Sequence, residues 1–271
     1  AVHTYNATLN SFTKFSGGQG TEEMLVTDVF TAGKLKEYEA WLRSRNASWN
    51  TVSTYMRVLK AVYNRLVEAK RLTYDARLFD SVYTKVEAQS KRSLTEEQMN
   101  TLLRTDFEKL PEDVQNVLAY FLLMFLFRGM PFIDMAYLRK QDLKEHCITY
   151  CRHKTGKKMV VRIPHEATAL FEKCRNKKTD SGYLFPILDE TTENEKKLYE
   201  NYRQALRTFN RKLAKMAALL LPGTNISSYT ARHTWATLAF YSGIPIGIIS
   251  KALGHSSIKV TETYLKPFEN E

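Results

Sequence analysis

Two short helices are predicted near the C-terminus, and this stretch constrains the fold of the chain more than any other. The first helix carries Arg232 near its start, and the second ends at Gly254. His255 is the first side chain after that glycine, and Tyr264 follows nine residues later. Two helix ends and a turn can therefore bring an arginine, a histidine and a tyrosine around one point.

The apolar spacing indicates where these two helices begin and which side they bury. Ser227 or Ser228 is the expected N-cap of the first helix, and Gly243 is expected to stop it. Its predicted buried face consists of Trp235, Leu238 and Ala239. The second helix is expected over residues 246–253, with Pro245 early in it.

An arginine, a histidine and a tyrosine without a carboxylate cluster suit the attack on a phosphodiester. Arginine binds phosphate oxygens with its planar fork of donors, imidazole can donate to a further oxygen, and tyrosine can act as a covalent nucleophile. This set needs no metal, and the sequence shows neither the carboxylate clustering of a two-metal nuclease nor a phosphate-binding P-loop. We therefore expect no metal and no other cofactor.

The charge of the chain predicts an anionic partner. Its 271 residues include 40 Lys and Arg against 29 Asp and Glu, a formal net charge of +11, which points to nucleic acid first. An anionic membrane surface is the weaker option, because no basic amphipathic anchor stands apart from the rest of the chain. The longest apolar run, residues 117–127, is too short to span a bilayer, and we expect no membrane partner. The three cysteines lack metal-like spacing and are typical of reduced thiols in a cytoplasmic protein.

Residues 1–88 are predicted to form an all-helical domain. One helix is expected over residues 1–15, and a second is expected to start at Thr31 and end near Arg45. The clearest helix starts at Ser48 or Asn50, because apolar side chains then recur at helical spacing up to residue 67. Its other face carries Ser53, Arg57, Lys60 and Asn64. This face is either a solvated surface or a surface that follows a phosphate backbone.

A polar, basic stretch around residues 89–94 is interpreted as a linker, and a second domain is expected over residues 95–271. Thr95 and Gln98 have the spacing of a capping box, and a nearly all-apolar helix around residues 117–127 must be central to the core. Short strand signals at residues 148–152 and 159–163 flank a turn that contains Gly156, which predicts a β-hairpin.

The C-terminal stretch resembles the tyrosine recombinases, also called phage-type integrases. The resemblance rests on Arg232-His233-Thr234-Trp235-Ala236-Thr237, on Leu253-Gly254-His255, and on Tyr264 nine residues further on. It implies a mainly α fold: an N-terminal helical core-binding domain that contacts DNA, followed by a mostly α catalytic domain with a small three-stranded antiparallel sheet. It also implies that DNA is cleaved and rejoined through a 3′-phosphotyrosyl intermediate.

The resemblance assigns roles residue by residue. Tyr264 would attack the scissile phosphorus, while Arg232 and His255 would bind its non-bridging oxygens. Lys154, in the hairpin turn, matches the lysine of the family and would protonate the leaving 5′-oxygen. Outside the resemblance, Arg232 could make a structural ion pair, His255 could cap a helix, and Lys154 could be a solvated turn residue. Asp134 and His233 are expected to orient other groups.

Two positions depart from the family pattern. The family places its first arginine in a T-G-x-R-x-x-[ED] segment, where this chain has Pro131, with Arg128 three residues earlier. We predict that Arg128 supplies the missing guanidinium from one helical turn away; the alternative is that it only interacts with the carbonyl end of its helix. The second departure is Tyr229, where a histidine or lysine is usual; it could bind a phosphate oxygen or only pack.

Three functional hypotheses follow. The first is a site-specific recombinase, the integrase of a mobile element, that acts on double-stranded attachment sites. It would assemble into a synaptic oligomer on DNA, and it can be a monomer when no DNA is bound. The second is a catalytically impaired DNA-binding accessory protein on the same fold. The third is a DNA-relaxing enzyme that resembles the type IB topoisomerases and acts without partner subunits.

Overall fold

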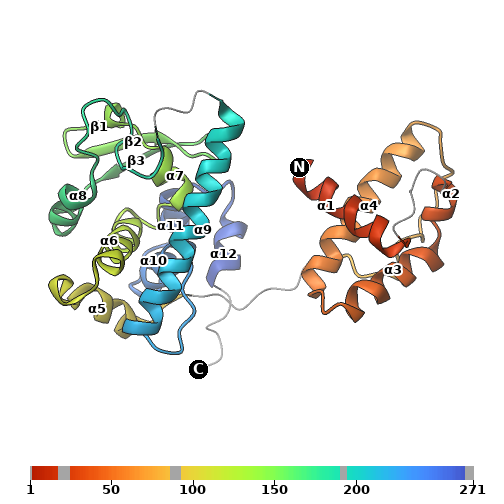
Figure 1. The fold of residues 1–271 in the computed structure, drawn as a ribbon, viewed down its shortest axis with the longest axis horizontal. Helices are drawn as coiled ribbons and strands as arrows, with labels where there is room; N and C mark the ends of the chain where they lie inside the picture. The colour runs from red at the N-terminus through yellow and green to blue at the C-terminus, as the bar shows by residue number, and fades with distance from the viewer. Residues whose placement is uncertain (1, 18–24, 86–92, 190–193, 266–271) are drawn as a thin grey trace. The chain divides into compact units, whose positions relative to one another are not determined.

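The computed structural model describes residues 2–17, 25–85, 93–189 and 194–265 and divides the chain into two compact units, residues 1–89 and 90–271 (Figure 1). Most of the predicted linker, residues 89–94, falls outside the described residues and stays a prediction. As expected, the chain is mainly α-helical with one small sheet. Each unit has its own hydrophobic core.

The described residues of the first unit, 2–17 and 25–85, form four helices. They are α1 (Val2–Phe15), α2 (Val26–Val29), α3 (Ala32–Ser44) and α4 (Trp49–Glu68). Thr31 and Ser48 cap α3 and α4 by accepting hydrogen bonds from backbone N–H groups in the first turn, as predicted from their side chains. The core packs aromatic rings edge to face, for example Phe12 against Tyr38 at 5.0 Å between ring centres.

Helix α4 carries the buried stripe that its spacing predicts, with one correction. Val52, Met56 and Leu59 are buried against the core. Ser53 was expected on the outer face, but it is 1% exposed, because its small side chain lies at the edge of the apolar stripe. The outer face therefore carries Arg57, Lys60 and Asn64, which are all exposed.

The second unit is organised around the apolar helix α6. Its first elements are α5 (Glu96–Arg104), α6 (Glu112–Leu126) and α7 (Phe132–Tyr137), and the later helices are α8 (Thr168–Cys174), α9 (Glu195–Leu220), α10 (Thr230–Tyr241), α11 (Ile246–Leu253) and α12 (Ile258–Leu265). Short 3-10 turns lie at Phe107–Lys109, Lys140–Asp142 and His165–Ala167. The predicted capping box of Thr95 and Gln98 is present at α5. Both α9 and α10 pack on α6, whose side chains are buried nearly all round.

The sheet is antiparallel in the order β1-β2-β3, with β1 at Leu143–Lys144, β2 at Cys147–Cys151 and β3 at Lys158–Arg162. The pairing of Ile148 with Val161 and of Tyr150 with Met159 confirms the predicted hairpin. Both strands begin one residue earlier than expected. Side chains of β2 alternate, so that Ile148 and Tyr150 face the core.

Helix α10 differs from its prediction at both its cap and its buried face. The N-cap is Tyr229, and no side chain caps the helix; Ser227 instead belongs to the preceding turn, where its backbone N–H donates to Thr230. Trp235 and Leu238 are only half-buried. The fully buried side chains include four polar ones, Thr230, Arg232, Thr234 and Thr237. This helix turns a polar side inward because that side forms part of the site described next.

Candidate active site

Tyr264, on α12, lies among the cationic and imidazole groups that the sequence predicts around it. Its ring centre is 4.4 Å from that of His233 and 4.9 Å from that of His255. The charge of the Arg232 guanidinium also acts on the Tyr264 phenol and opposes the rise in pKa that burial causes there. Helices α10 and α12 and the end of α11 therefore converge on one phenol.

Arg232 stands in the first turn of α10 and is 2% exposed. Its Nη1 donates to the carbonyl oxygen of Gly129 at 2.9 Å, and its Nη2 donates to the carbonyl oxygen of Leu253. Gly129 has a φ of +67°, and a Cβ at this position would lie 2.9 Å from the Cα of Arg232. Only glycine therefore allows the loop after α6 to approach the arginine this closely.

His255 follows Gly254, which ends α11 in the left-handed conformation, as the sequence predicts. The imidazole is 7% exposed, and its Nδ1 lies 2.9 Å from the hydroxyl oxygen of Thr261 on α12. Burial, together with the charges of Arg232 and Arg152, lowers the pKa of His255 to about 3. The ring is therefore neutral near pH 7, with Nε2 available to a ligand.

A second arginine, Arg152, lies in the same cluster. It is 4% exposed, and its Nη1 donates to the carbonyl oxygens of Leu253 at 2.8 Å and Gly254 at 3.0 Å. Its Nε is 3.8 Å from Oδ2 of Asp134. The other carboxylate oxygen of Asp134 accepts a hydrogen bond from the backbone N–H of His153 at 2.9 Å. Asp134 thus holds both the strand end and the arginine that follows it.

Burial raises the pKa of Tyr264, and the nearby phenol of Tyr229 raises it further. The charges of Arg232 and Arg152 act in the opposite direction. Burial is the larger influence, so the phenol is protonated near pH 7. Burial and the charge of Arg152 likewise lower the pKa of Arg232.

The predicted lysine, Lys154, is exposed in the turn between β2 and β3. Its charge is among those that lower the pKa of His255. A second lysine of the same turn, Lys157, lies with Nζ 3.5 Å from the carbonyl oxygen of His255. The hairpin turn therefore meets the loop that follows α11.

Two other predicted residues are less closely involved. Tyr229 is 43% exposed, and its ring centre is 5.8 Å from that of His233, at the rim of the cluster. Arg128 is exposed and has a φ of +57°, directly before Gly129. In the described part of the chain no contact joins Arg128 to Arg232, His255 or Tyr264, so its predicted role stays a prediction.

Sequence reasoning missed Arg152. The signal was the alternation of the hairpin strand, in which residues 148 and 150 face the core and residue 152 is next on that face. A charged side chain at an inward position requires a partner or a function. Arg152 has both a carboxylate and two carbonyl groups within reach.

The predicted DNA-binding residues, Arg57, Lys60 and Asn64, lie on α4 in the other unit and share its exposed face. The Lys60 ammonium lies 5.6 Å from the ring centre of Phe79, so the aromatic ring supports its position. Arg57 and Asn64 lie one turn before and one turn after it. This face presents two positive charges about one helical turn apart.

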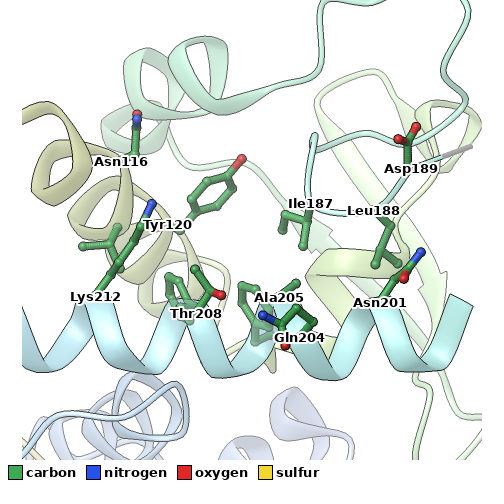
Figure 2. A pocket seen from close by; sticks show the side chains of 13 residues that line it. Asn116, Tyr120, Ile187, Leu188, Asp189, Asn201, Gln204, Ala205, Thr208 and Lys212 are labelled. Atoms are coloured by element: carbon green, nitrogen blue, oxygen red, sulfur yellow. The ribbon is translucent and has the colours of Figure 1, made fainter. Parts of the chain in front are cut away.

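A cavity of about 460 Å³ lies between α6, α9 and the segment of residues 187–189 (Figure 2). Its walls include Tyr120, Ile187 and Thr208, and none of the candidate catalytic residues. Among the described residues, no group of three or more His, Cys, Asp or Glu side chains could hold a metal ion. No helix in those same segments has the length and apolarity needed to cross a bilayer.

Comparison with known proteins identifies the family. Residues 92–271 match the phage integrase family, and residues 1–77 match the phage integrase SAM-like domain. Tyrosine recombinase XerA of Pyrococcus furiosus is 26% identical over 243 residues, which cover 87% of this chain and 76% of that protein. Transposase B of transposon Tn554 from Staphylococcus aureus is 28% identical over 257 residues, which cover 86% of this chain but only 38% of the transposase.

Solved structures share the fold over nearly the whole chain. A lambda integrase dimer bound to a COC′ core site has a TM-score of 0.69 at 15% identity and covers 98% of this chain and 88% of that one. The Tn1549 transposon integrase in complex with a circular intermediate DNA has a TM-score of 0.65 at 18% identity, with 96% and 89% covered. The family match spans the whole candidate site, so this chain belongs to the phage integrase family and is a tyrosine recombinase.

Proposed function

We propose that this chain is a site-specific DNA recombinase that cleaves and rejoins double-stranded DNA through a covalent bond to Tyr264. One observation carries the proposal: the Tyr264 ring lies 4.9 Å from the neutral imidazole of His255, and the charge of the buried Arg232 acts on its phenol. A phenol in such a setting is placed to attack an anionic phosphorus centre bound by the same groups.

In the proposed reaction, the Tyr264 oxygen attacks the scissile phosphorus and loses its proton to water, while the bond from phosphorus to the 5′-oxygen breaks. Lys154 gives a proton to that leaving oxygen. A 3′-phosphotyrosyl bond and a free 5′-hydroxyl result. The reverse attack, by the 5′-hydroxyl of another strand, restores the phenol. Because one ester replaces another, the scheme includes no nucleotide hydrolysis.

The surrounding groups have separate proposed tasks. Arg232 binds non-bridging oxygens and stabilises the charge that grows on the five-coordinate phosphorus. His255, being neutral, donates from Nε2 to one of these oxygens when Nδ1 accepts from Thr261. Asp134 and His233 hold other side chains of the site in place, and Tyr229 lies at the rim, where its hydroxyl can reach DNA.

For the rest of the chain, we propose that residues 1–88 form a core-binding domain and residues 95–271 a catalytic domain that together bind DNA. The solved relatives include integrases in complex with DNA, a dimer on a core site and a tetramer bound to a Holliday junction. We infer that this chain also binds double-stranded attachment sites and assembles into an oligomer on them. The described cysteines are free thiols, which supports a place in the cytoplasm.

The test is to trap the covalent intermediate. A pool of nicked DNA duplexes of random sequence is incubated with the protein, and the nick lets the short 5′-hydroxyl strand diffuse away so that the adduct accumulates. Denaturing gels and mass spectrometry then locate the adduct, and sequencing of the trapped DNA identifies the preferred site.

Wild-type protein should form an adduct on Tyr264, and Tyr264→Phe should form none while DNA affinity stays within a few fold. Tyr229→Phe is the matched control, because it removes the other phenol hydroxyl near the site and should still form the adduct. Binding without any adduct would support the catalytically impaired accessory protein instead. Relaxation of supercoiled DNA by a monomer, without exchange between duplexes, would support the topoisomerase-like alternative.

A further inference from the structure

Arg152 is a buried charge at the centre of the site. Its Nη1 binds the two carbonyl oxygens that immediately precede His255, and Asp134 lies beside its Nε. The approach is close: a Cβ on Gly254 would lie 2.8 Å from the Sδ of Met159 and 3.2 Å from the Cδ of Arg152. The chain therefore keeps glycine at this position, at a φ of +67°, and Arg152 packs directly beneath the loop that carries His255.

The cluster has an excess of positive charge. Arg152 and Arg232 are both buried, and the proximity of Arg152 contributes to the lowered pKa of Arg232. Only one carboxylate, Asp134, lies within ion-pair distance of either arginine among the described residues. Buried like charges are strongly unfavourable unless a counter-ion compensates for them. An anion bound between both guanidinium groups would offset the repulsion of their positive charges.

Two buried donors that lack acceptors among the described residues also indicate an anion-binding site. The Nε–H groups of Arg152 and Arg232 are buried, and neither has a hydrogen-bond acceptor in the described part of the chain. Each such buried donor left without an acceptor destabilises the folded protein. Two such donors beside a candidate nucleophile suit the oxygens of an anionic phosphate as their acceptors.

We propose that Arg152 is the second catalytic arginine, which binds a non-bridging oxygen of the scissile phosphate together with Arg232. This inference rests on the proposed strand-transfer function. In the family, an arginine at the position of Pro131 binds the phosphate. We assign that role here to Arg152, which directly follows strand β2. As the five-coordinate phosphorus forms, its oxygens gain negative charge, and the Arg152 guanidinium stabilises it without any proton transfer.

The groups that shift the pKa values of the site residues favour Arg152, rather than Arg128, as the second arginine. Arg152 is among the groups that shift the pKa values of Tyr264, Arg232 and His255, and Arg128 is not among the causes of any of these shifts. Arg128 is also exposed at the end of α6. The sequence-based assignment to Arg128 is therefore the competing outcome of the experiment.

The test compares two versions of the duplex selected in the trapping experiment. One has a normal scissile phosphate, and the other has a methylphosphonate, in which a methyl group replaces one non-bridging oxygen and removes the negative charge. Single-turnover adduct formation is measured for wild type, Arg152→Ala and Arg128→Ala. Arg175→Ala is the control, because it removes a surface arginine that pairs with Glu172.

Arg152→Ala should cut cleavage of the phosphate by roughly 10²–10³-fold, the usual loss for one transition-state donor. The deficit should shrink to less than about tenfold on the methylphosphonate, because less charge then needs stabilisation. A purely structural role predicts the same deficit on both substrates and would overturn the proposal. So would a charge-dependent deficit in Arg128→Ala without one in Arg152→Ala.

Two results remain distinguishable from failure of the inference. If wild-type protein forms no adduct on any duplex, the proposed function fails, and Arg152 is not at issue. If Arg152→Ala does not fold, Arg152→Lys replaces it, because lysine keeps a charge but not the forked geometry. Its deficit must also shrink on the methylphosphonate, and an equal deficit on both substrates counts against the proposal.

Discussion

Arg152 and Arg232 donate to the same acceptor, the carbonyl oxygen of Leu253. Leu253 is the last residue of α11, where helix carbonyls lack partners within the helix and carry partial negative charge. Two guanidinium groups repel each other, so a shared acceptor of this kind holds them side by side before DNA arrives. The same contact ties both arginines to the loop that carries His255.

The first prediction concerns Gly129, which makes room for Arg232. Gly129→Ala should lower the free energy of unfolding by about 2–4 kcal/mol, because it combines left-handed strain of about 1–2 kcal/mol with a clash against backbone. The clash is with the Cα of Arg232, 2.9 Å from the added Cβ. Denaturant midpoints and adduct yield are the measurements, and both should fall.

Gly243→Ala is the matched control. Gly243 has a similar positive φ of +79°, but nothing lies within 4 Å of an added Cβ. It should cost only the strain, about 1–2 kcal/mol, and leave adduct formation intact. Equal effects of the two substitutions on stability and on cleavage would show that the contact between Gly129 and Arg232 does not matter.

The second prediction concerns His255 and pH. Its pKa is about 3 in the folded protein and about 6.5 when unfolded, so the unfolded chain binds more protons between these values. The contribution of His255 to the free energy of unfolding is therefore complete above pH 6.5. It declines as pH falls below that value, by up to about 1.4 kcal/mol per pH unit. His255→Gln should not show this contribution.

The measurement is the free energy of unfolding of wild type relative to His255→Gln between pH 7 and pH 5, which cancels groups common to both. The difference should move against wild type as pH falls. NMR of the imidazole in the free protein gives a direct check, since the ring should remain neutral at pH 5. Protonation of His255 with a midpoint near 6.5 would contradict the predicted burial effect.

The helices and the triad of Arg232, His255 and Tyr264 were predictable because their determinants are local. Glycine in the left-handed conformation ends α11 wherever that helix lies, and the capping box starts α5 from four adjacent residues. The spacing from His255 to Tyr264 spans only one loop and one short helix. These interactions need no knowledge of distant parts of the chain.

Arg152 was not predicted, because its role depends on contacts about a hundred residues away in the sequence, at Leu253 and Gly254. The inward polar side of α10 was missed for the same reason. Thr234, for example, is buried because it accepts a hydrogen bond from the backbone N–H of Leu94 at 2.9 Å. Apolar periodicity cannot identify a helix face that is buried through polar partners.

The third prediction concerns the exposed face of α4. If Arg57 and Lys60 each neutralise a phosphate, the slope of log affinity against log salt should become shallower by about 0.9 for each one removed. Asn64→Ala should weaken binding without changing the slope, because asparagine is uncharged. Filter binding or anisotropy over a salt series measures both quantities.

Lys34→Gln serves as the control in the same unit, because Lys34 pairs with Glu37 at 3.2 Å and is not on that face. Its salt slope should match that of wild type. A double variant of Arg57 and Lys60 with an unchanged slope would show that this face is merely solvated, which is the other interpretation of its charges.

The last prediction assigns the proton donor between two lysines of one turn. Lys154→Ala should slow cleavage by roughly 10²–10⁴-fold, the usual contribution of a general acid. The defect should nearly vanish when sulfur replaces the bridging 5′-oxygen. A thiol has a pKa of about 8.5, whereas a hydroxyl such as that of water has one near 15.7, so the sulfur leaves without being protonated.

Lys157→Ala is the control. It should slow cleavage only a few fold on either substrate, because Lys157 contacts the backbone of His255. Single-turnover rates on the oxygen and sulfur duplexes decide between them: a defect rescued by sulfur in Lys157→Ala, and none in Lys154→Ala, would transfer the acid role to Lys157.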